Sequence, residues 1–368
     1  MRLTPPVTCV VPLKWDDDGD GAEFTTYLRW LSTQAAVIVV DGSPAPLFAA
    51  HSHAWSGFVQ HVPPDARSGH NGKVAGVHTG VRLARTERVV LADDDVRYDA
   101  ATLATVTGLL EEADLVGPQN VFQPLPWHAA WDTSRSLLNR AFMADYPGTF
   151  ALRRSTFVAM GGYNGDVLFE NLELMRTVRA FGGRVVRPLD AYVSRRPPSV
   201  ARFRAQRVRQ AFDDLAQPWR MVTFLVTLPL ALVVARRRGP TPIALAATGL
   251  VAIAESGRRR AGGRAVFPAR TSWFAPLWVA ERSSCAWVAL GRLAFCGGVG
   301  YAGARLRVAA HTTGWIRRRQ EAGPHPLVAT GGSEPDGIVG AIAEGFQAGA
   351  PAPAQGDSRP ARVDLAAG

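Results

Sequence analysis

Short apolar runs alternate with longer amphipathic segments over the first 120 residues. The runs are rich in β-branched residues and are bounded by Gly, Pro or Asp, which is typical of buried strands. They cover residues 7–13, 37–41, 57–62, 88–92 and 114–117. Between them, Val74, Val77, Val81 and Ala84 share one face of a predicted helix, and residues 99–113 form a second. This alternation predicts an α/β fold with a mostly parallel sheet flanked by helices, which binds ligands at the carboxyl ends of its strands.

The pattern changes after residue 218. Residues 221–235 and 239–254 carry no charge, although each is shorter than the roughly 20 residues that cross a bilayer. Together they predict a helical hairpin in the membrane. A third apolar stretch, from Trp273 to Gly303, is interrupted by charged residues and either spans the membrane or lies in its interface. The alternative is a pair of buried helices in a soluble α-helical domain.

These patterns divide the chain into three parts. We expect an α/β domain over residues 1–218 and a membrane-associated helical region over residues 219–310. Residues 322–368 are rich in Gly, Ala and Pro without periodicity, so we expect a disordered tail there.

The charge balance favours an anionic partner. The 368 residues include 41 Lys and Arg against 31 Asp and Glu, a formal net charge of +10. Because the arginines concentrate beside the apolar segments, lipid headgroups explain them better than nucleic acid, which we do not expect as a partner. Three scattered cysteines and the lack of a secretory signal favour a reducing compartment. We therefore expect localisation at the cell membrane, with the α/β domain in the cytoplasm.

The apolar run at residues 89–92 leads directly into Asp93, Asp94 and Asp95. Adjacent carboxylates at the end of a strand offer oxygen ligands to a hard cation such as Mg²⁺ or Mn²⁺. Such a cation would bridge to a diphosphate and would let the carboxylates tolerate one another. The alternative is a solvated acidic turn, which is common after strands.

Four motifs follow one another along the chain: VVPLKWDDDGD at the start, VIVVDGSP around Asp41, GHNGKVAGVHTGVRLAR around Lys73, and the Asp93–Asp95 cluster. Their order resembles that of the inverting family 2 glycosyltransferases of the GT-A fold. The resemblance covers residues 7–210. It implies that Asp41 binds the base or ribose of a nucleotide sugar and that Asp93 and Asp95 hold nucleotide and metal. It also places Asp94 and Lys73 among the residues that contact the donor.

The same resemblance implies a catalytic base after the glycine-rich turn at Gly161 and Gly162. Family members carry a Glu-Asp pair there, and this chain reads Glu170-Asn171. Asn171 cannot accept the proton of the acceptor hydroxyl. Glu170 therefore takes the role, Glu173 substitutes one turn later, or catalysis is lost. The alternative for both glutamates is that they favour a helix start through its dipole.

A further family motif is Gln-x-x-Arg-Trp, whose arginine approaches the diphosphate. Gln206 and Arg209 match its spacing, and Gln210 replaces the tryptophan that helps to seat a growing glycan. The replacement favours transfer of a single sugar over polymer synthesis. A basic amphipathic helix on anionic lipid is the alternative, and both can hold.

The sequence thus predicts a metal-dependent inverting glycosyltransferase that uses a nucleotide-sugar donor and a lipid-linked acceptor. The alternatives are a nucleotidyltransferase, which would release diphosphate, and a catalytically inactive nucleotide-sugar-binding scaffold at the membrane. His51, His53 and His61 show no metal-ligand spacing with nearby Cys or carboxylate residues, so surface or packing roles are predicted for them.

Overall fold

The structure of the protein, a computed structural model, describes residues 7–17, 19, 21–65, 70–301 and 304–322. All of these residues belong to one compact unit, Met1–Thr330. The expected tail over residues 322–368 lies outside the described residues, apart from Ala322.

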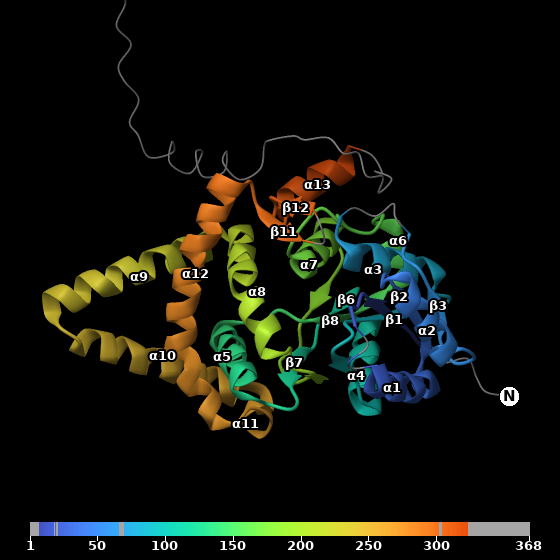
Figure 1. Cartoon of the computed structure of the whole chain (residues 1–368), viewed down its shortest axis with the longest axis horizontal. Helices are drawn as coiled ribbons and strands as arrows, with labels where there is room; N and C mark the ends of the chain where they lie inside the picture. Colours follow the sequence, from blue (N-terminus) through green and yellow to red (C-terminus); the bar gives the residue numbers. More distant parts are fainter. Residues whose placement is uncertain (1–6, 18, 20, 66–69, 302–303, 323–368) are drawn as a thin grey trace, which may run out of the picture. The chain divides into compact units, whose positions relative to one another are not determined.

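A seven-stranded sheet forms the core of the α/β half of this unit, on the right in Figure 1. Its order is β3-β2-β1-β4-β8-β6-β9, and β8 is antiparallel to its neighbours β4 and β6, whereas the other pairs are parallel. The strands are β1 (Val7–Leu13), β2 (Ala36–Asp41), β3 (Gln60–Val62), β4 (Arg88–Ala92), β6 (Leu115–Val116), β8 (Thr149–Arg153) and β9 (Val185–Val186). The predicted α/β fold with a mostly parallel sheet is confirmed.

Helices cover both faces of the sheet. Alternate residues of β1 point to opposite sides, so Val10 joins one core cluster while Cys9 and Val11 join the other. The helices are α1 (Gly21–Gln34), α2 (Ala45–Trp55), α3 (Gly72–Leu83), α4 (Ala100–Gly108) with a 3₁₀ turn at Leu109–Glu111, α6 (Arg154–Ala159) and α7 (Glu170–Ala180). The first core holds apolar side chains of α3, α6 and α7, and the second holds those of α1 and α4.

The direction in which the sheet grows reverses at β1. From β1 the chain first builds outward through β2 and β3, and then returns to add β4 on the other side of β1. Because β1, β2 and β4 are parallel, their carboxyl ends lie along one edge of the sheet. Ligands of open α/β sheets bind at this kind of reversal, outside the carboxyl ends of the strands.

Two glycines bring α3 close to β1. A Cβ at Gly80 would lie 2.1 Å from Val10 Cγ1, and a Cβ at Gly76 would lie 2.8 Å from Pro12 Cβ. Side chains at these positions would push the helix away from the sheet. The glycines therefore fix where α3 begins relative to the carboxyl end of β1.

A small second sheet, in the order β5-β10-β7, lies beside the acidic turn. Its strands are β5 (Val96–Arg97), β10 (Tyr192–Arg195) and β7 (Gln119–Phe122). Arg195 of β10 is the antiparallel partner of Val96, the residue after Asp95. The pairing thus carries Arg195 to the acidic turn from 100 positions later in the chain.

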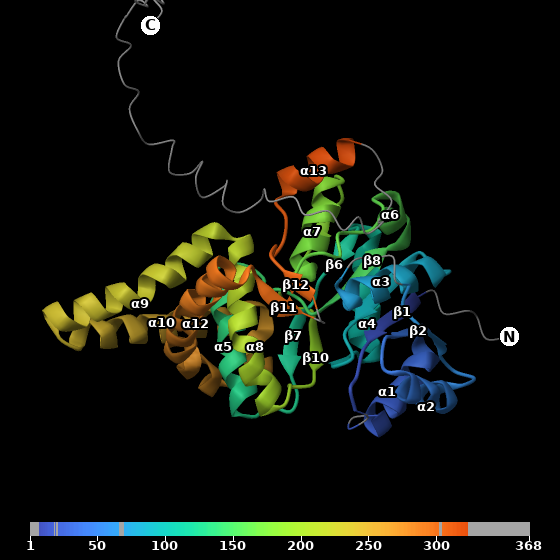
Figure 2. The same ribbon diagram turned by 45° about the horizontal axis from the view of Figure 1, so that its top comes forward.

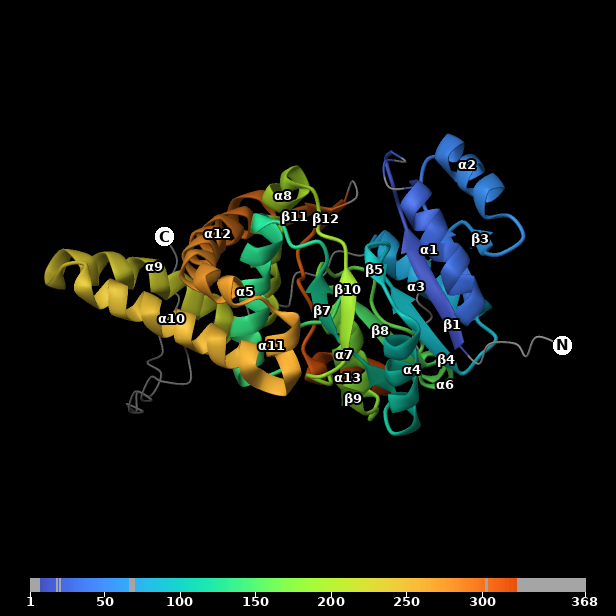
Figure 3. The ribbon, with the colours of Figure 1, turned by 90° about the horizontal axis from the view of Figure 1, so that it is seen from below.

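The second half of the unit is helical. It contains α5 (Trp127–Phe142), α8 (Val200–Phe212) with a 3₁₀ turn η2 (Asp213–Ala216), α9 (Pro218–Arg238), α10 (Thr241–Arg259), α11 (Gly263–Val266) and α12 (Ala275–Cys296), with further 3₁₀ turns at Arg260–Gly262 and Ala269–Phe274. α10 packs on α5 and α12 packs on α8. Figures 2 and 3 show α9 and α10 running side by side as a hairpin that leaves the rest of the helices.

The hairpin differs from the predicted pair of membrane helices in one respect. Among the described residues, α9 is long and apolar enough to cross a membrane by length and composition, and only 11% of its apolar window is buried. α10 does not qualify. It ends in a cluster of Glu255, Arg258 and Arg259, and its Gly257 packs directly on the backbone of α5.

The chain then returns to the α/β half. A two-stranded ribbon of β11 (Val299–Tyr301) and β12 (Ala304–Leu306) precedes α13 (Thr313–Glu321), which packs on α7. Between them, Val308 and Ala309 accept backbone hydrogen bonds from Leu168 and Phe169, at 3.1 and 2.8 Å. The segment after the apolar helices therefore holds the residues that immediately precede Glu170.

Candidate active site

The three aspartates lie at the carboxyl edge of the sheet, directly after β4, and each contacts a different partner. Asp93 Oδ1 lies 2.7 Å from Lys73 Nζ. Asp94 Oδ2 accepts a hydrogen bond of 2.5 Å from Trp15 Nε1. Asp95 Oδ2 lies 2.8 Å from Arg195 Nε, which also places its guanidinium 3.5 Å from Asp93 Oδ2. The aspartates are thus held by two cations and an indole.

One carboxylate oxygen of Asp95 has no partner among the described residues. This oxygen, Oδ1, is buried. Burial raises the pKa of Asp95 to about 6, against the opposing effect of Arg195 and together with the negative charges of Asp93 and Asp94. A buried carboxylate oxygen without a partner costs free energy unless a ligand satisfies it. This oxygen and the neighbouring Asp93 fit the oxygen ligands that Mg²⁺ and Mn²⁺ prefer.

Lys73 joins the aspartates to the predicted base. Its ammonium lies 2.9 Å from Glu170 Oε1 and 2.7 Å from Asp93 Oδ1. Burial alone would lower the pKa of Lys73, but the charges of Asp93 and Glu170 outweigh it and raise the pKa above its usual range. Lys73 therefore keeps its positive charge. It lies in the first turn of α3, where the cap Asn71 accepts a hydrogen bond from the Lys73 amide.

Asn171 is tied to the backbone beside the same pocket. Its Nδ2 donates to the Pro147 carbonyl at 3.2 Å, and its Oδ1 lies 3.4 Å from Lys73 Nζ. The pocket is lined by Pro12, Lys73, Val77, Leu91, Ala92, Asp93, Gly148, Phe150, Tyr163, Asn171 and Leu174. Gly148 leaves room for Arg195, because a Cβ there would lie 2.7 Å from its guanidinium.

A chain of contacts connects the aspartates to Asp41. Trp15 donates its backbone amide to Ser43 Oγ at 2.9 Å, while its indole holds Asp94. The Ser43 amide in turn donates to Asp41 Oδ1 at 2.8 Å. Trp15 therefore bridges the turn after β2 and the turn after β4.

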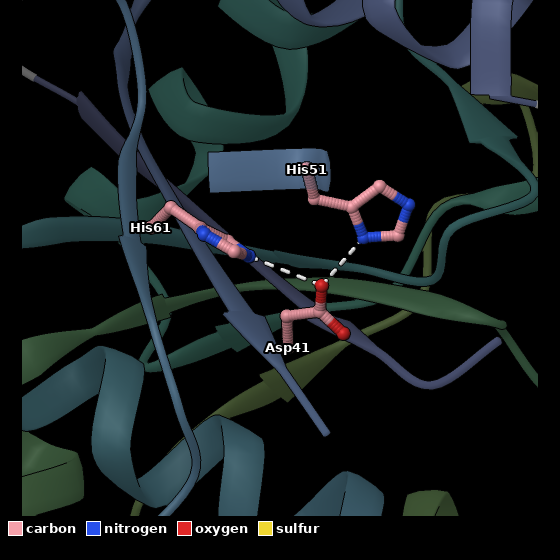
Figure 4. A group of neighbouring side chains, drawn as sticks. All are labelled: Asp41, His51 and His61. Atoms are coloured by element: carbon pink, nitrogen blue, oxygen red, sulfur yellow. Dashed lines mark hydrogen bonds and ion pairs between the residues drawn. The ribbon is translucent and has the colours of Figure 1, made fainter. Parts of the chain in front are cut away.

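Asp41 itself is enclosed. Its side chain has 0% exposure, and its Oδ2 contacts His51 Nδ1 at 2.6 Å and His61 Nε2 at 3.1 Å (Figure 4). Burial alone would raise the pKa of Asp41, but the hydrogen bonds from His61, Ser43 and His51 hold it below its usual range. In this conformation the carboxylate touches no solvent. The hydrogen-bond path from Asp41 to the acidic turn runs through Ser43 and Trp15.

Glu173, the alternative base, points elsewhere. Its side chain is 1% exposed, and its oxygens accept from the His311 amide at 2.7 Å and contact His311 Nδ1 at 2.9 Å. Arg176 donates to the His311 carbonyl at 2.7 Å. Glu173 thus joins α7 to the returning C-terminal segment, and Glu170 is the glutamate that faces the aspartates.

The α8 residues lie in the helical half. Gln206 and Arg209 are both half-buried on α8, and Gln206 makes no hydrogen bond or ion pair with any residue that the structure describes. Burial raises the pKa of Asp213, one turn further along the chain, and the positive charge of Arg209 partly opposes that rise.

Sequence reasoning did not anticipate that His51 and His61 contact Asp41, and it missed two further residues near the acidic turn and Glu170. Arg195 contacts both metal-binding candidates, although it lies in an unremarkable stretch, AYVSRR. Asp213 is a carboxyl group whose pKa burial raises to about 8, with Glu170 among the charges that raise it further. Its Oδ1 is buried without a hydrogen-bond partner in the described part of the chain. Nothing in the motif spacing distinguishes either residue.

No protein-family model matches the chain, and no curated protein matches its sequence. Among solved structures it is similar to the mannosyltransferase PcManGT from Pyrobaculum calidifontis in complex with GDP-Man and Mn²⁺, at 20% identity, covering 78% of this chain and 88% of that chain, with a TM-score of 0.44. A mycobacterial protein matches at 17% identity, 56% and 72% coverage and a TM-score of 0.36. A protein proposed to be a nucleotide-diphospho-sugar transferase, from Desulfovibrio desulfuricans G20, matches at 9% identity, covering 53% of this chain and 83% of that chain, with a TM-score of 0.33. Likeness at this level carries no argument about function, which rests on the residues of the site.

Proposed function

We propose that the protein transfers a single sugar, with inversion, from a nucleotide-diphosphate donor to an acceptor at the membrane. The observation that carries the proposal is the acidic turn after β4, where Asp95 keeps a buried, unpartnered oxygen beside Asp93. Asp93 and Asp95 would hold Mg²⁺ or Mn²⁺, whose charge stabilises the departing diphosphate. The turn lies at the carboxyl edge of the sheet, which is where an α/β fold binds a nucleotide.

The nearby cations support a diphosphate ligand. Lys73 lies in the first turn of α3, whose amides and dipole favour a negative ligand. Arg195 presents a planar group of donors suited to phosphate oxygens. In the structure both cations neutralise the aspartates. We propose that they turn to the diphosphate when the donor binds, and that Asp94 and Trp15 border the donor site.

Glu170 is the proposed base. The acceptor oxygen attacks the anomeric carbon, the bond from that carbon to the diphosphate oxygen breaks, and the hydroxyl proton passes to the Glu170 carboxylate. Before the donor binds, Lys73 Nζ lies 2.9 Å from Glu170 Oε1 and 2.7 Å from Asp93 Oδ1, so Glu170 lies beside the acidic turn. Glu173 cannot share this role in the described conformation because His311 occupies both of its oxygens.

The remaining predicted contacts are indirect. We propose that Asp41 positions the nucleoside end of the site through Ser43, since its own carboxylate is enclosed. Arg209, with Gln206 on the same helix, would approach the leaving diphosphate. This approach requires α8 to place both side chains next to a bound donor. Position 210 is Gln rather than Trp, which favours transfer of a single sugar.

A lipid-linked acceptor fits the helical half. α9 exposes Val222, Val226, Leu230 and Val233 along one side, at spacings of four, four and three residues. Burying such a face in lipid is favourable at about 25 cal/mol per Å² of apolar surface. We propose that α9 holds the protein at the cell membrane with the catalytic half in the cytoplasm. The apolar tail of the acceptor could then stay in the bilayer while its hydroxyl reaches Glu170.

Vesicle flotation tests this membrane contact. The full chain should float with vesicles of mixed neutral and anionic lipid, and Val226→Asp combined with Leu230→Asp should lower the bound fraction severalfold because two charges enter the apolar face. Val158→Asp, at an exposed valine of α6, is the matched control and should float like the wild type. Equal flotation of all three proteins would refute the role of α9.

Turnover tests the enzyme. Purified protein with Mn²⁺, membrane lipid extract and a panel of nucleotide sugars should release a nucleoside diphosphate. Asp95→Asn should lower that rate by about 100-fold or more, because it removes stabilisation of the leaving group. Asp190→Asn, the same change at an exposed carboxylate, should leave it unchanged. Release of inorganic diphosphate would instead identify a nucleotidyltransferase, and silence of the wild type with retained donor binding would identify the scaffold suggested by Asn171.

A further inference from the structure

A second group of metal-binding side chains lies at the carboxyl end of β2. Asp41, His51 and His61 each offer one ligand atom, and the three atoms lie within 4.8 Å of one another. We propose that these residues bind a zinc ion, separate from the cation of the acidic turn. Figure 4 shows both imidazoles converging on one oxygen of Asp41.

The charge of the group argues for a cation. Asp41 has no exposed side-chain surface, and its Oδ2 lies 2.6 Å from His51 Nδ1 and 3.1 Å from His61 Nε2. In the described part of the chain, no Lys or Arg pairs with it; its only ion-pairing neighbours are the two histidines. Buried carboxylates are paired with cations or coordinate metals, because an uncompensated charge is costly in the interior. A divalent ion with two neutral imidazoles supplies that compensation.

The donor set indicates which metal. Two imidazole nitrogens and one carboxylate oxygen are typical zinc ligands, whereas Mg²⁺ prefers oxygens alone. Three protein ligands leave one position for a non-protein ligand. The acidic turn offers only carboxylates, so the two sites should select different ions.

The surroundings resemble the second shell of a metal site. His61 Nδ1 bonds Ser52 Oγ at 2.8 Å, which leaves Nε2 directed at the cluster. Ring orientation is fixed on both sides, since Phe48 stacks on His61 with centroids 4.3 Å apart and Trp55 stacks on His51 at 4.4 Å. Such partners fix the orientation of ligating histidines and exclude water.

Three separate segments supply the ligands. Asp41 ends β2, His51 lies in α2 and His61 lies in β3. A shared ion would therefore join β2, α2 and β3 next to the turn that carries Ser43. Because Trp15 bonds both Ser43 and Asp94, the ion would also stabilise the turn that holds Asp94. The ion would lie beside the turn that carries Ser43, at the nucleoside end of the proposed donor site. The inference does not depend on the proposed reaction.

Metal analysis of the full chain tests the inference. Protein prepared without a histidine tag from zinc-supplemented medium should retain a single zinc per chain after dialysis, measured by mass spectrometry of the metal. His51→Gln and His61→Gln should each lose it. His53→Gln, an exposed histidine two positions from His51 on the same helix, should keep it. Asp95→Asn should also keep it, which separates this site from the acidic turn.

A second readout needs no variant. Metal-free wild type should give the visible absorption of tetrahedral Co²⁺ when that ion is added, and zinc should displace the signal and raise Tm. A folded wild type that binds neither ion would overturn the inference and leave a hydrogen-bonded cluster. Zinc retained by both His51→Gln and His61→Gln would overturn it as well, because the ion would then lie elsewhere.

Discussion

Two acidic groups at the same edge of one sheet are held in opposite ways. Asp93 and Asp95 follow β4, are partly exposed, and are paired with Lys73 and Arg195. Asp41 ends β2 and has no exposed side-chain surface; one of its oxygens contacts His51 and His61, and the other accepts a hydrogen bond from the Ser43 amide. The first group has two ion-paired cations and, among the described residues, one oxygen without a partner, whereas both oxygens of Asp41 have partners. The difference separates an open site suited to a ligand that comes and goes from a closed one suited to permanent structure.

The largest expected effect lies at the open site. Glu170→Gln removes the proposed proton acceptor while keeping a polar side chain near Lys73. We expect kcat to fall by about 10²–10⁴-fold, which is the usual contribution of a positioned base. Binding of the nucleotide should change little. Glu112→Gln, at an exposed glutamate, is the control and should retain full activity. If Glu170→Gln turned over normally, the base would have to be another group, with Asp213 the next candidate.

Next in size is a contrast in stability between the two groups, measured by urea unfolding in EDTA at pH 7.5. Asp41→Asn should cost about 1–3 kcal/mol, because two imidazoles and the Ser43 amide lose a buried charged acceptor. Asp95→Asn should cost little or stabilise the fold, because burial disfavours its charge. Equal losses in the two variants would contradict the distinction between closed and open sites.

The pH dependence of that contrast should have opposite signs. The pKa of Asp41 is lowered in the folded chain, so its contribution is present above the unfolded value of about 4 and is lost as the pH falls below it. The pKa of Asp95 is raised to about 6, so its contribution is present below about pH 4 and is lost as the pH rises through 6. The Asp41→Asn deficit should therefore shrink in acid, and any Asp95→Asn gain should grow between pH 4 and 7. If the stability changes of the two variants depended on pH in the same way, the opposite pKa shifts of Asp41 and Asp95 would be refuted.

Much of the open site follows from local sequence patterns. β-branched runs predict β1, β2 and β4, and parallel strands bring their carboxyl ends to one edge. This arrangement of parallel strands brings Asp93 close to the first turn of α3, which carries Lys73. Glu170 joins them from 97 positions later in the chain, a neighbour that the resemblance of motifs indicated and the structure brings to Lys73.

The closed site could not be predicted in the same way. His51 and His61 have no ligand spacing in the sequence, because their convergence depends on how α2 folds back and β3 pairs with β2. Similarly, Glu173 meets His311 across 138 positions, and a helix-dipole pattern cannot reveal that partner. The membrane pattern was also ambiguous, since α10 is apolar in sequence but packs on α5. Residues whose roles depend on long-range packing are the ones that local patterns miss.

The most direct test of the central claim is calorimetric titration of nucleoside diphosphates into the full chain, with Mn²⁺ or with EDTA, for the wild type and Asp95→Asn. We expect one nucleoside diphosphate to bind the wild type only when Mn²⁺ is present, and Asp95→Asn to weaken that binding by at least about 10-fold, or about 1.4 kcal/mol. Binding of equal strength in EDTA, or no loss in Asp95→Asn, would contradict a metal-bridged diphosphate at the turn after β4.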